Sequence, residues 1–339
     1  MDIPNPLAEP AQIDRTSFER DFLEQGRPAV FRGLVKHWPL VEAAERSPEA
    51  LADYLKGKYN GSPVESFVAP ADQQGRHFYD PEMRGFNFQR RQVALSEMLD
   101  KLLAMANGQD LSGDLALYAG SVPASSCLPD LAQHNPMPLL PPEIEPRIWI
   151  GNGSRVAAHF DPDLNIACAI SGTRRFILFP PEQVANLYIG PLEFNMAGPP
   201  ASLVDFANPD HERFPRFAEA WEQRIEVELS PGDALFIPPL WWHHVEADGA
   251  FNMLVNYWWG THKQRQQMPA LALAMLAIRE RPLAERQAWR TLFDHYVFGE
   301  DAGDAAAHIP AHAQGVLGEA NPQRDAIILS FIQQSLARR

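Results

Sequence analysis

Cysteine and clustered positive charge are what this sequence of 339 residues has least of. It contains only two cysteines, Cys127 and Cys168, which excludes both a disulfide framework and a zinc ribbon. Lys and Arg number 29 against 43 Asp and Glu, so the net charge is −14. A chain this acidic lacks the basic clusters that hold a nucleic acid backbone or an anionic membrane surface. We therefore expect neither nucleic acid nor membrane as a partner.

Long apolar runs are also missing. No uninterrupted apolar stretch approaches the roughly 20 residues that cross a bilayer. The first residues, MDIPNPLAEPAQID, show no basic segment followed by an apolar one, as a secretory leader would. Together with the scarce cysteines, these features predict a soluble protein of the reducing cytoplasm. The apolar content of 45% is typical of a globular chain with a buried core.

The pattern along the chain divides it into three regions. Residues 1–113 predict helices and a strand that wrap a core; the segment 16–26 should be a helix that begins with a Thr16/Glu19 capping box and ends at Gly26. Residues 114–261 consist of short apolar segments cut by Pro and Gly, such as DLALYAG, RIWIGNG and FNMLVNYWWG. Many short strands with such turns predict a barrel or jelly roll, so the fold class is mainly β with flanking helices. Residues 262–339 return to a helical pattern.

A candidate metal site begins at His159-Phe160-Asp161, just ahead of an apolar run. Alternate residues of a strand face the same side, so His159 and Asp161 would point together if one strand runs from 159 to 170. The motif alone is weak, because 11 His and 43 acidic residues make about one such pair by chance. A polar loop before a buried strand is the alternative.

The continuation of this strand supports a ligand site. Its odd positions are polar and then small (Asp163, Asn165, Ala167, Ala169), whereas its even positions are bulky (Leu164, Ile166, Cys168, Ile170). A face of small residues beside two candidate ligands leaves room for a bound group inside a barrel. A thin strand pressed against a helix would explain the same pattern.

A third ligand is offered by PGDALFIPPLWWHHVEA, in which either His243 or His244 could serve. Adjacent strand residues face opposite ways, so only one of them can bind the same ion. Two histidines and one carboxylate form the facial triad that binds Fe(II) and leaves the other positions open. Aromatic packing is the alternative reading of the WWHH segment.

Several segments in a fixed order carry a family resemblance: HFD, SGTRRFILFPP, VDFANPDHERFP, SPGDALFIPPLWWHHVE and VNYWWG. This series resembles the cupin-like Jumonji-C (JmjC) family of Fe(II)- and 2-oxoglutarate-dependent oxygenases, and within it the asparaginyl hydroxylases. The resemblance implies a double-stranded β-helix, with Fe(II), 2-oxoglutarate and O2 as cofactor and cosubstrates. It also implies that His159, Asp161 and His243 are the metal ligands, and that His244 faces away.

The resemblance further implies a cosubstrate pocket. A family tyrosine that holds the distal carboxylate of 2-oxoglutarate matches Tyr118, and the family lysine beside it is replaced by Arg174. A guanidinium can pair with a carboxylate through two bonds, although it is longer and flatter than an ammonium. Family residues near the cosubstrate match Asn165, Asn256 and Trp258.

The resemblance favours a protein or peptide side chain as the substrate, with a small molecule as the other option. Two other classes of function stay open: a zinc-binding cupin that acts on or binds a sugar, and a non-catalytic binding module of the same fold. The C-terminal region, 262–339, carries more apolar residues at helical spacing than a small helical segment can bury. It therefore predicts a homodimer through these helices, with packing onto the barrel as the alternative.

Overall fold

A ten-stranded antiparallel sheet forms the centre of the computed structural model, which describes residues 7–109, 115–196, 198–260 and 267–337. The strand order is β1-β9-β7-β10-β5-β4-β2-β3, with β6 paired to β10 and β8 paired to β7. The strands are β1 (Ala29–Phe31), β2 (Pro63–Pro70), β3 (Gln89–Ala94), β4 (Leu115–Pro123), β5 (Pro146–Gly151), β6 (Ser154–His159), β7 (Leu164–Phe179), β8 (Ile225–Leu229), β9 (Ala234–Ile237) and β10 (Trp242–Trp259).

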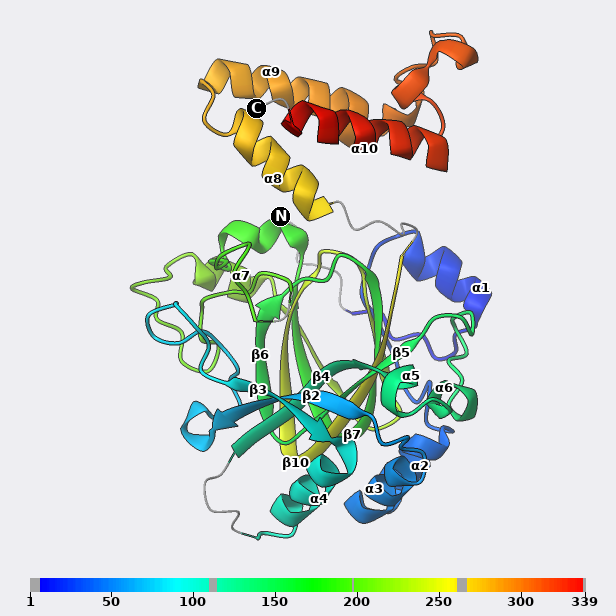
Figure 1. Ribbon diagram of the computed structural model, residues 1–339, viewed down its shortest axis with the longest axis vertical. Helices are drawn as coiled ribbons and strands as arrows, with labels where there is room; N and C mark the ends of the chain where they lie inside the picture. Colours follow the sequence, from blue (N-terminus) through cyan, green and yellow to red (C-terminus); the bar gives the residue numbers. More distant parts are fainter. Residues whose placement is uncertain (1–6, 110–114, 197, 261–266, 338–339) are drawn as a thin grey trace. The chain divides into compact units, whose positions relative to one another are not determined.

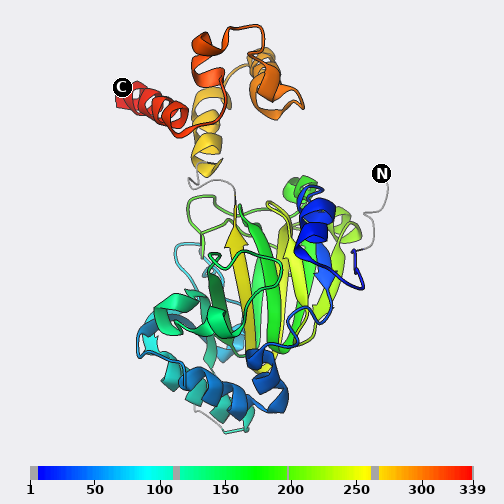
Figure 2. The same ribbon diagram turned by 90° about the vertical axis from the view of Figure 1, so that its right-hand side faces the viewer.

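The two longest strands, β7 and β10, pair with each other through both halves of the sheet (Figures 1 and 2). The start of β7 also pairs with β9, and the end of β10 with β5. Their other halves pair with β8 and β6. Each long strand therefore passes from one layer of strands into a second, as in a jelly roll. The predicted mainly β fold with flanking helices is confirmed, and its strands pair antiparallel.

The side chains of β7 alternate between two environments. Ile166, Cys168 and Ile170 pack in the main apolar cluster, which also contains residues of the flanking helices. Ala167 and Ala169 belong to a second cluster, on the opposite face of the strand. The predicted alternation of bulky and small residues is confirmed. The small residues face the interior between the two layers, and the bulky ones face the helices.

The flanking helices of this unit contribute leucines to the main cluster, including Leu51, Leu99 and Leu102. Their bounds are α1 (Arg15–Phe18), α2 (Pro39–Arg46), α3 (Pro48–Lys56), α4 (Leu95–Ala106), α5 (Ala124–Cys127), α6 (Leu131–His134) and α7 (Phe217–Glu222). Both cysteines are free and fully buried, Cys127 at the end of α5 and Cys168 within β7.

The first helix starts earlier than predicted. Its capping box is made by Asp14 and Ser17, whose side chains bond each other's backbone N–H at 2.8 and 3.1 Å. The predicted Thr16/Glu19 box is wrong, because Asp14 caps the helix and Thr16 already lies inside it. The helix continues as a π-helical turn, Glu19–Leu23. Gly26, with φ +59, follows it as predicted.

Contacts divide the chain into two units at residues 263 and 264. The predicted boundaries at 113/114 and 261/262 fall outside the described residues. The second unit contains α8 (Gln267–Ile278), α9 (Leu283–Phe293) and α10 (Pro322–Ala337), so its predicted helical character is confirmed. None of these three helices has a buried residue. Within the described ranges, no helix has the length and apolar content to span a bilayer.

Candidate metal centre

His159, Asp161 and His243 come together where β6 pairs with β10. His159 is the last residue of β6 and lies opposite His243, the second residue of β10. Each of the three offers one ligand atom that lies within 4.8 Å of the other two. His243 Nε2 is 3.5 Å from Asp161 Oδ2, and the two imidazole centroids are 4.3 Å apart. The structure thus brings the three predicted ligands within reach of one ion.

The chain between these ligands does not follow the predicted path. We expected one strand from 159 to 170, but β6 ends at His159 and β7 begins at Leu164. Pro162 lies in the gap and has no N–H for a strand ladder, which explains the break. Asp161 O instead accepts a bond of 2.9 Å from Leu240 N, and this bond ties the turn to the segment before His243.

Both histidines are held in the same tautomer. His159 Nδ1 lies 2.9 Å from Ala157 O, and His243 Nδ1 lies 3.0 Å from Trp241 O. A carbonyl oxygen can only accept, so each Nδ1 carries a proton and each Nε2 is the nitrogen left for an ion. Burial and the neighbouring His243 lower the pKa of His159 to about 4, which keeps this ring neutral. Neutral imidazoles are the form that binds metals.

Asp161 is held as a buried carboxylate. Burial alone would raise its pKa, but the contact with His243 and the hydrogen bond from Trp258 outweigh burial and hold the pKa below its usual value. Its Oδ2 accepts bonds from Trp258 Nε1 at 3.1 Å and Asn165 Nδ2 at 3.2 Å. An ionised, oriented oxygen beside two imidazole nitrogens fits a divalent transition metal.

A chain of hydrogen bonds supports Asp161 from the interior of the sheet. Trp149 Nε1 donates to Asn256 Oδ1 at 2.7 Å, and Asn256 Nδ2 donates to Asn165 Oδ1 at 3.1 Å. Asn165 in turn donates to Asp161. Each amide uses its oxygen as acceptor and its nitrogen as donor, which fixes the orientation of both. The predicted residues Asn165, Asn256 and Trp258 therefore all lie beside the centre, and Trp149 was not predicted.

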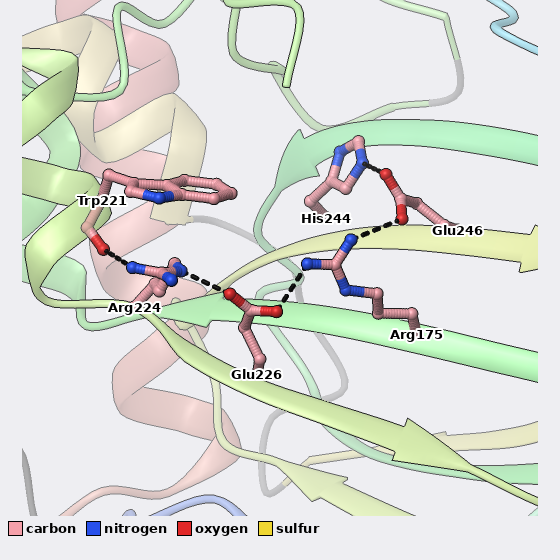
Figure 3. A network of polar contacts seen from close by, with 6 residues as sticks. All are labelled: Arg175, Trp221, Arg224, Glu226, His244 and Glu246. Carbon is pink, nitrogen blue, oxygen red and sulfur yellow. Dashed lines mark hydrogen bonds and ion pairs between the residues drawn. The ribbon is translucent and has the colours of Figure 1, made fainter. Parts of the chain in front are cut away.

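His244 belongs to a polar network with Glu246 and Arg175 (Figure 3). Its Nε2 bonds Glu246 Oε1 at 3.2 Å, and Glu246 is paired with Arg175 at 3.1 Å. The imidazole stacks on Phe206, with centroids 4.4 Å apart. The hydrogen bond from His244, opposed by burial, lowers the pKa of Glu246 to about 2. His243 therefore faces the ion position, as the alternation of adjacent strand residues predicts.

Arg174 and Tyr118 lie together deeper in the sheet. Arg174 is 2% exposed, its Nε donates to Asn252 Oδ1, and its guanidinium is within hydrogen-bonding reach of the Tyr118 hydroxyl. Among the described residues, no carboxylate forms an ion pair with Arg174. A buried cation is costly unless it is paired, so this arrangement fits an anionic ligand.

Gly172 decides which face of β7 carries Arg174. Asn165 and Arg174 are nine positions apart, so an unbroken strand would place them on opposite faces. Gly172 adopts φ +72 and β10 shifts register opposite it, after Asp248. Before this irregularity the odd-numbered Ala167 and Ala169 face the interior. After it, the even-numbered Phe176 and Leu178 face the interior. Arg174 lies two residues before Phe176, so its side chain is on the same face as that of Phe176. This is the interior face that also carries Asn165.

Asn252 was missed by the sequence analysis. It is fully buried on β10, and its Nδ2 donates to Thr173 O and Asp248 O, each at 3.1 Å. Both N–H groups are thereby used, so the amide oxygen faces Arg174. The one available signal was a polar residue inside the apolar segment FNMLVNYWW.

Comparison with known proteins agrees with this geometry. Residues 15–265 match the cupin-like domain model. The chain belongs to the cupin-like domain family. That region contains the whole ten-stranded sheet and all three candidate ligands.

Several relatives of this cupin-like chain are named for the JmjC domain. It is 27% identical over 254 residues to JmjC domain-containing protein D of Dictyostelium discoideum, a match that covers 68% of this chain and 51% of the relative. It is 26% identical over 266 residues to Jumonji C domain-containing protein 5 of Drosophila melanogaster, with coverages of 73% and 59%. A third relative is tRNA wybutosine-synthesizing protein 5 of Danio rerio, 26% identical over 286 residues, with coverages of 76% and 77%. The match spans little more than half the length of the first two.

Proposed function

We propose that this cupin-like protein is an Fe(II)- and 2-oxoglutarate-dependent dioxygenase that hydroxylates an unactivated C–H bond. The observation that carries the proposal is the grouping of two imidazole nitrogens and one carboxylate oxygen from His159, His243 and Asp161. This donor set suits Fe(II) and leaves coordination positions open on one side. The JmjC names of the relatives support the same class, as does a match to a lysine-specific demethylase of Arabidopsis thaliana, 34% identical over 112 residues.

The cosubstrate proposal rests on Arg174 and Tyr118. Both line the interior, and the guanidinium has no acidic partner among the described residues. A guanidinium pairs well with a carboxylate through two parallel bonds, so Arg174 would hold the distal carboxylate of 2-oxoglutarate. Ala167 and Ala169 are the small residues on the face of β7 between this pair and the metal centre.

The protein residues would have distinct tasks. His159 and His243 would bind the iron through Nε2 and Asp161 through its carboxylate, while Trp258 and Asn165 fix the orientation of Asp161. When bound, Fe(II) with 2-oxoglutarate supplies the oxidising chemistry. The fold places Asn165 and Arg174 on the same face of β7 and gives a buried interior between the metal centre and Arg174.

For the substrate we propose a protein or peptide side chain, as in the asparaginyl hydroxylases that the sequence resembles. A small molecule is the alternative. The names of the relatives point to different substrates, since one is a lysine-specific demethylase and another a tRNA wybutosine-synthesizing protein. The net charge of −14 argues against a nucleic acid.

The test is to mix the purified protein with Fe(II) and 2-oxoglutarate without oxygen and record the metal-to-ligand charge-transfer absorption. Oxygen is then added and succinate is measured. We expect both the band and succinate from the wild-type chain, and neither from His159→Ala. A wild-type protein that gives no band and no succinate would show that the oxygenase proposal is wrong.

The same preparation separates the two other classes. Metal analysis after expression without added iron would find tightly bound zinc in a sugar-binding cupin. A non-catalytic binding module would release no succinate under any metal. An intact set of three ligand residues disfavours the second alternative, because a module without chemistry has no need to keep them.

A further inference from the structure

Arg147 lies on β5 beside the side chains that support Asp161. It is paired in register with Asn256 of β10, and its guanidinium lies over the Trp258 ring, 5.4 Å from the centroid. The edge of the same indole donates to Asp161 at 3.1 Å. A single aromatic ring thus separates this cation from a candidate metal ligand.

The side chains on this side of the centre are partly exposed. Asp161 and His243 are 8% and 3% exposed, whereas His159, Trp258 and Arg147 are each only half-buried. A substrate must approach the ion from the accessible side. It would therefore pass the face formed by Trp258 and Arg147.

Arg147 is held in place by an irregular stretch of β4. Its Nη1 donates to Ser121 O at 2.7 Å and to Ser121 Oγ at 3.0 Å. Ser121 adopts φ +55, and β4 shifts register against β5 between Ala119 and Val122. A positive φ is uncommon for a residue other than glycine and tends to persist where function needs it. Here it turns both Ser121 oxygens toward the arginine.

The charge of Arg147 is not neutralised within the described part of the chain. None of the carboxylates there forms an ion pair with it, and its Nε and Nη2 make no hydrogen bond to those residues. Arg224 offers a comparison, because it also stacks on a tryptophan, 4.3 Å from the Trp221 centroid. Arg224, however, is paired with Glu226 at 2.5 Å. The arginine stacked on Trp221 therefore has an acidic partner, and the one stacked on Trp258 has none among the described residues.

We propose that Arg147 binds a carboxylate of the substrate, so that the enzyme selects an acidic group close to the C–H bond it oxidises. The inference rests on the proposed function, because it names the substrate class of the same site. An overall charge of −14 gives no long-range attraction for an acid. Recognition must then come from this local cation, which Ser121 holds in place and whose Nε–H and Nη2–H groups have no acceptor among the described residues.

The test measures binding without turnover. Wild-type protein is loaded with Fe(II) and 2-oxoglutarate under anaerobic conditions and titrated into fluorescein-labelled heptapeptide pools that differ only in carrying Asp/Glu, Asn/Gln or Lys at fixed positions. We expect the acidic pool to bind about tenfold more tightly than the amide pool, which is typical of one charge-assisted hydrogen-bonded contact. Competition by free aspartate and glutamate shows whether a small acid satisfies the same contact.

Two variants and a control assign the effect to Arg147. Arg147→Gln should abolish the preference, and Arg147→Glu should invert it toward the Lys pool. Arg46→Gln removes the same charge from an exposed position at the end of α2 and should leave the preference intact. Equal affinity of wild-type protein for the acidic and amide pools would overturn the inference, as would a preference that survives Arg147→Gln. A missing charge-transfer band in wild-type protein would instead overturn the proposed function.

Discussion

At the scale of single residues, the orientation of Asp161 depends on side chains that do not reach the metal position. Trp258 and Asn165 both donate to its Oδ2. Partners of this kind fix a ligand before the ion arrives, and their loss typically costs about 10–100-fold in metal affinity. Their contribution can be measured separately from that of the ligands.

Trp258→Phe keeps an aromatic ring and removes only the indole N–H. We expect metal binding to weaken by about 10–100-fold, because the Asp161 carboxylate keeps the bond from Asn165 but loses the bond from the indole. Calorimetric titration with Co(II) measures this. His244→Gln, which changes a histidine on the opposite face, is the control and should bind metal as the wild type does. Wild-type affinity in Trp258→Phe would contradict the supporting role of Trp258.

Asn252 should determine how strongly Arg174 discriminates between oxo acids. Asn252→Leu removes the acceptor of Arg174 Nε and frees the guanidinium to turn. We expect the affinity for 2-oxoglutarate to fall by about tenfold, as for loss of a hydrogen bond to a charged group, and that for 2-oxobutyrate to stay the same. 2-Oxobutyrate lacks the distal carboxylate, so the ratio of the two dissociation constants isolates this contact. Equal losses for both acids would indicate a general structural defect instead.

The residues by themselves pointed to the metal ligands, whereas the other site residues came from the family resemblance or were missed. The motif at 159–161 pointed to His159 and Asp161, and the WWHH segment to either His243 or His244, because few residue types bind metals. The family resemblance then selected His243. Asn252 and Arg147 gave no such signal. An isolated polar residue in an apolar strand has many explanations until its partners in space are known.

At the scale of elements, the irregularity at Gly172 joins the two ends of the pocket on one face. The alternation from Asn165 to Ile170 could be predicted, since it needs only the two-residue repeat of a strand. The switch of face beyond Gly172 could not be predicted, because it depends on a register shift in the partner strand. The break between β6 and β7 was signalled by Pro162 and was overlooked.

Gly172→Ala tests this irregularity. A Cβ at Gly172 would lie 2.3 Å from Asn252 Nδ2, in addition to the strain of φ +72. Gly249→Ala is the matched control, because Gly249 has φ +99 but no atom within 4 Å of the added Cβ. We expect Gly172→Ala to lower the free energy of unfolding by about 1–3 kcal/mol more than Gly249→Ala in urea titrations. It should also weaken 2-oxoglutarate binding. Equal effects of the two changes would show that Asn252 can move without cost.

At the scale of the whole molecule, the C-terminal unit leaves its apolar surface open. Helix α8 consists mainly of apolar residues, yet neither it nor α9 or α10 has a buried residue. A groove of about 460 Å³ is lined mostly by apolar side chains of α8 and α9, among them Leu273, Ile278, Trp289 and Phe293. A helix that is apolar all round is normally buried. We propose that a second copy of the chain covers these helices.

Phe331→Glu tests the dimer. Phe331 of α10 is 70% exposed, and burying a carboxylate in its place would oppose association. We expect light scattering to show a dimer for the wild-type chain and a monomer for the variant. Gln334→Glu adds the same charge at an exposed polar position of α10 and should leave the dimer intact. A monomeric wild-type chain would show that a second copy does not cover these helices.

The two enclosed cysteines make the chain convenient for site-directed labelling. Cys127 and Cys168 are both fully buried, and burial raises the pKa of each thiol. Maleimides and iodoacetamides react with accessible thiolates, so the folded chain offers them no target. Leu240→Cys would then be the sole reactive position, since Leu240 is 48% exposed and its amide is bonded to Asp161 O. A nitroxide or fluorophore attached there would be relaxed or quenched when a paramagnetic ion enters, giving a direct optical or magnetic count of loaded molecules.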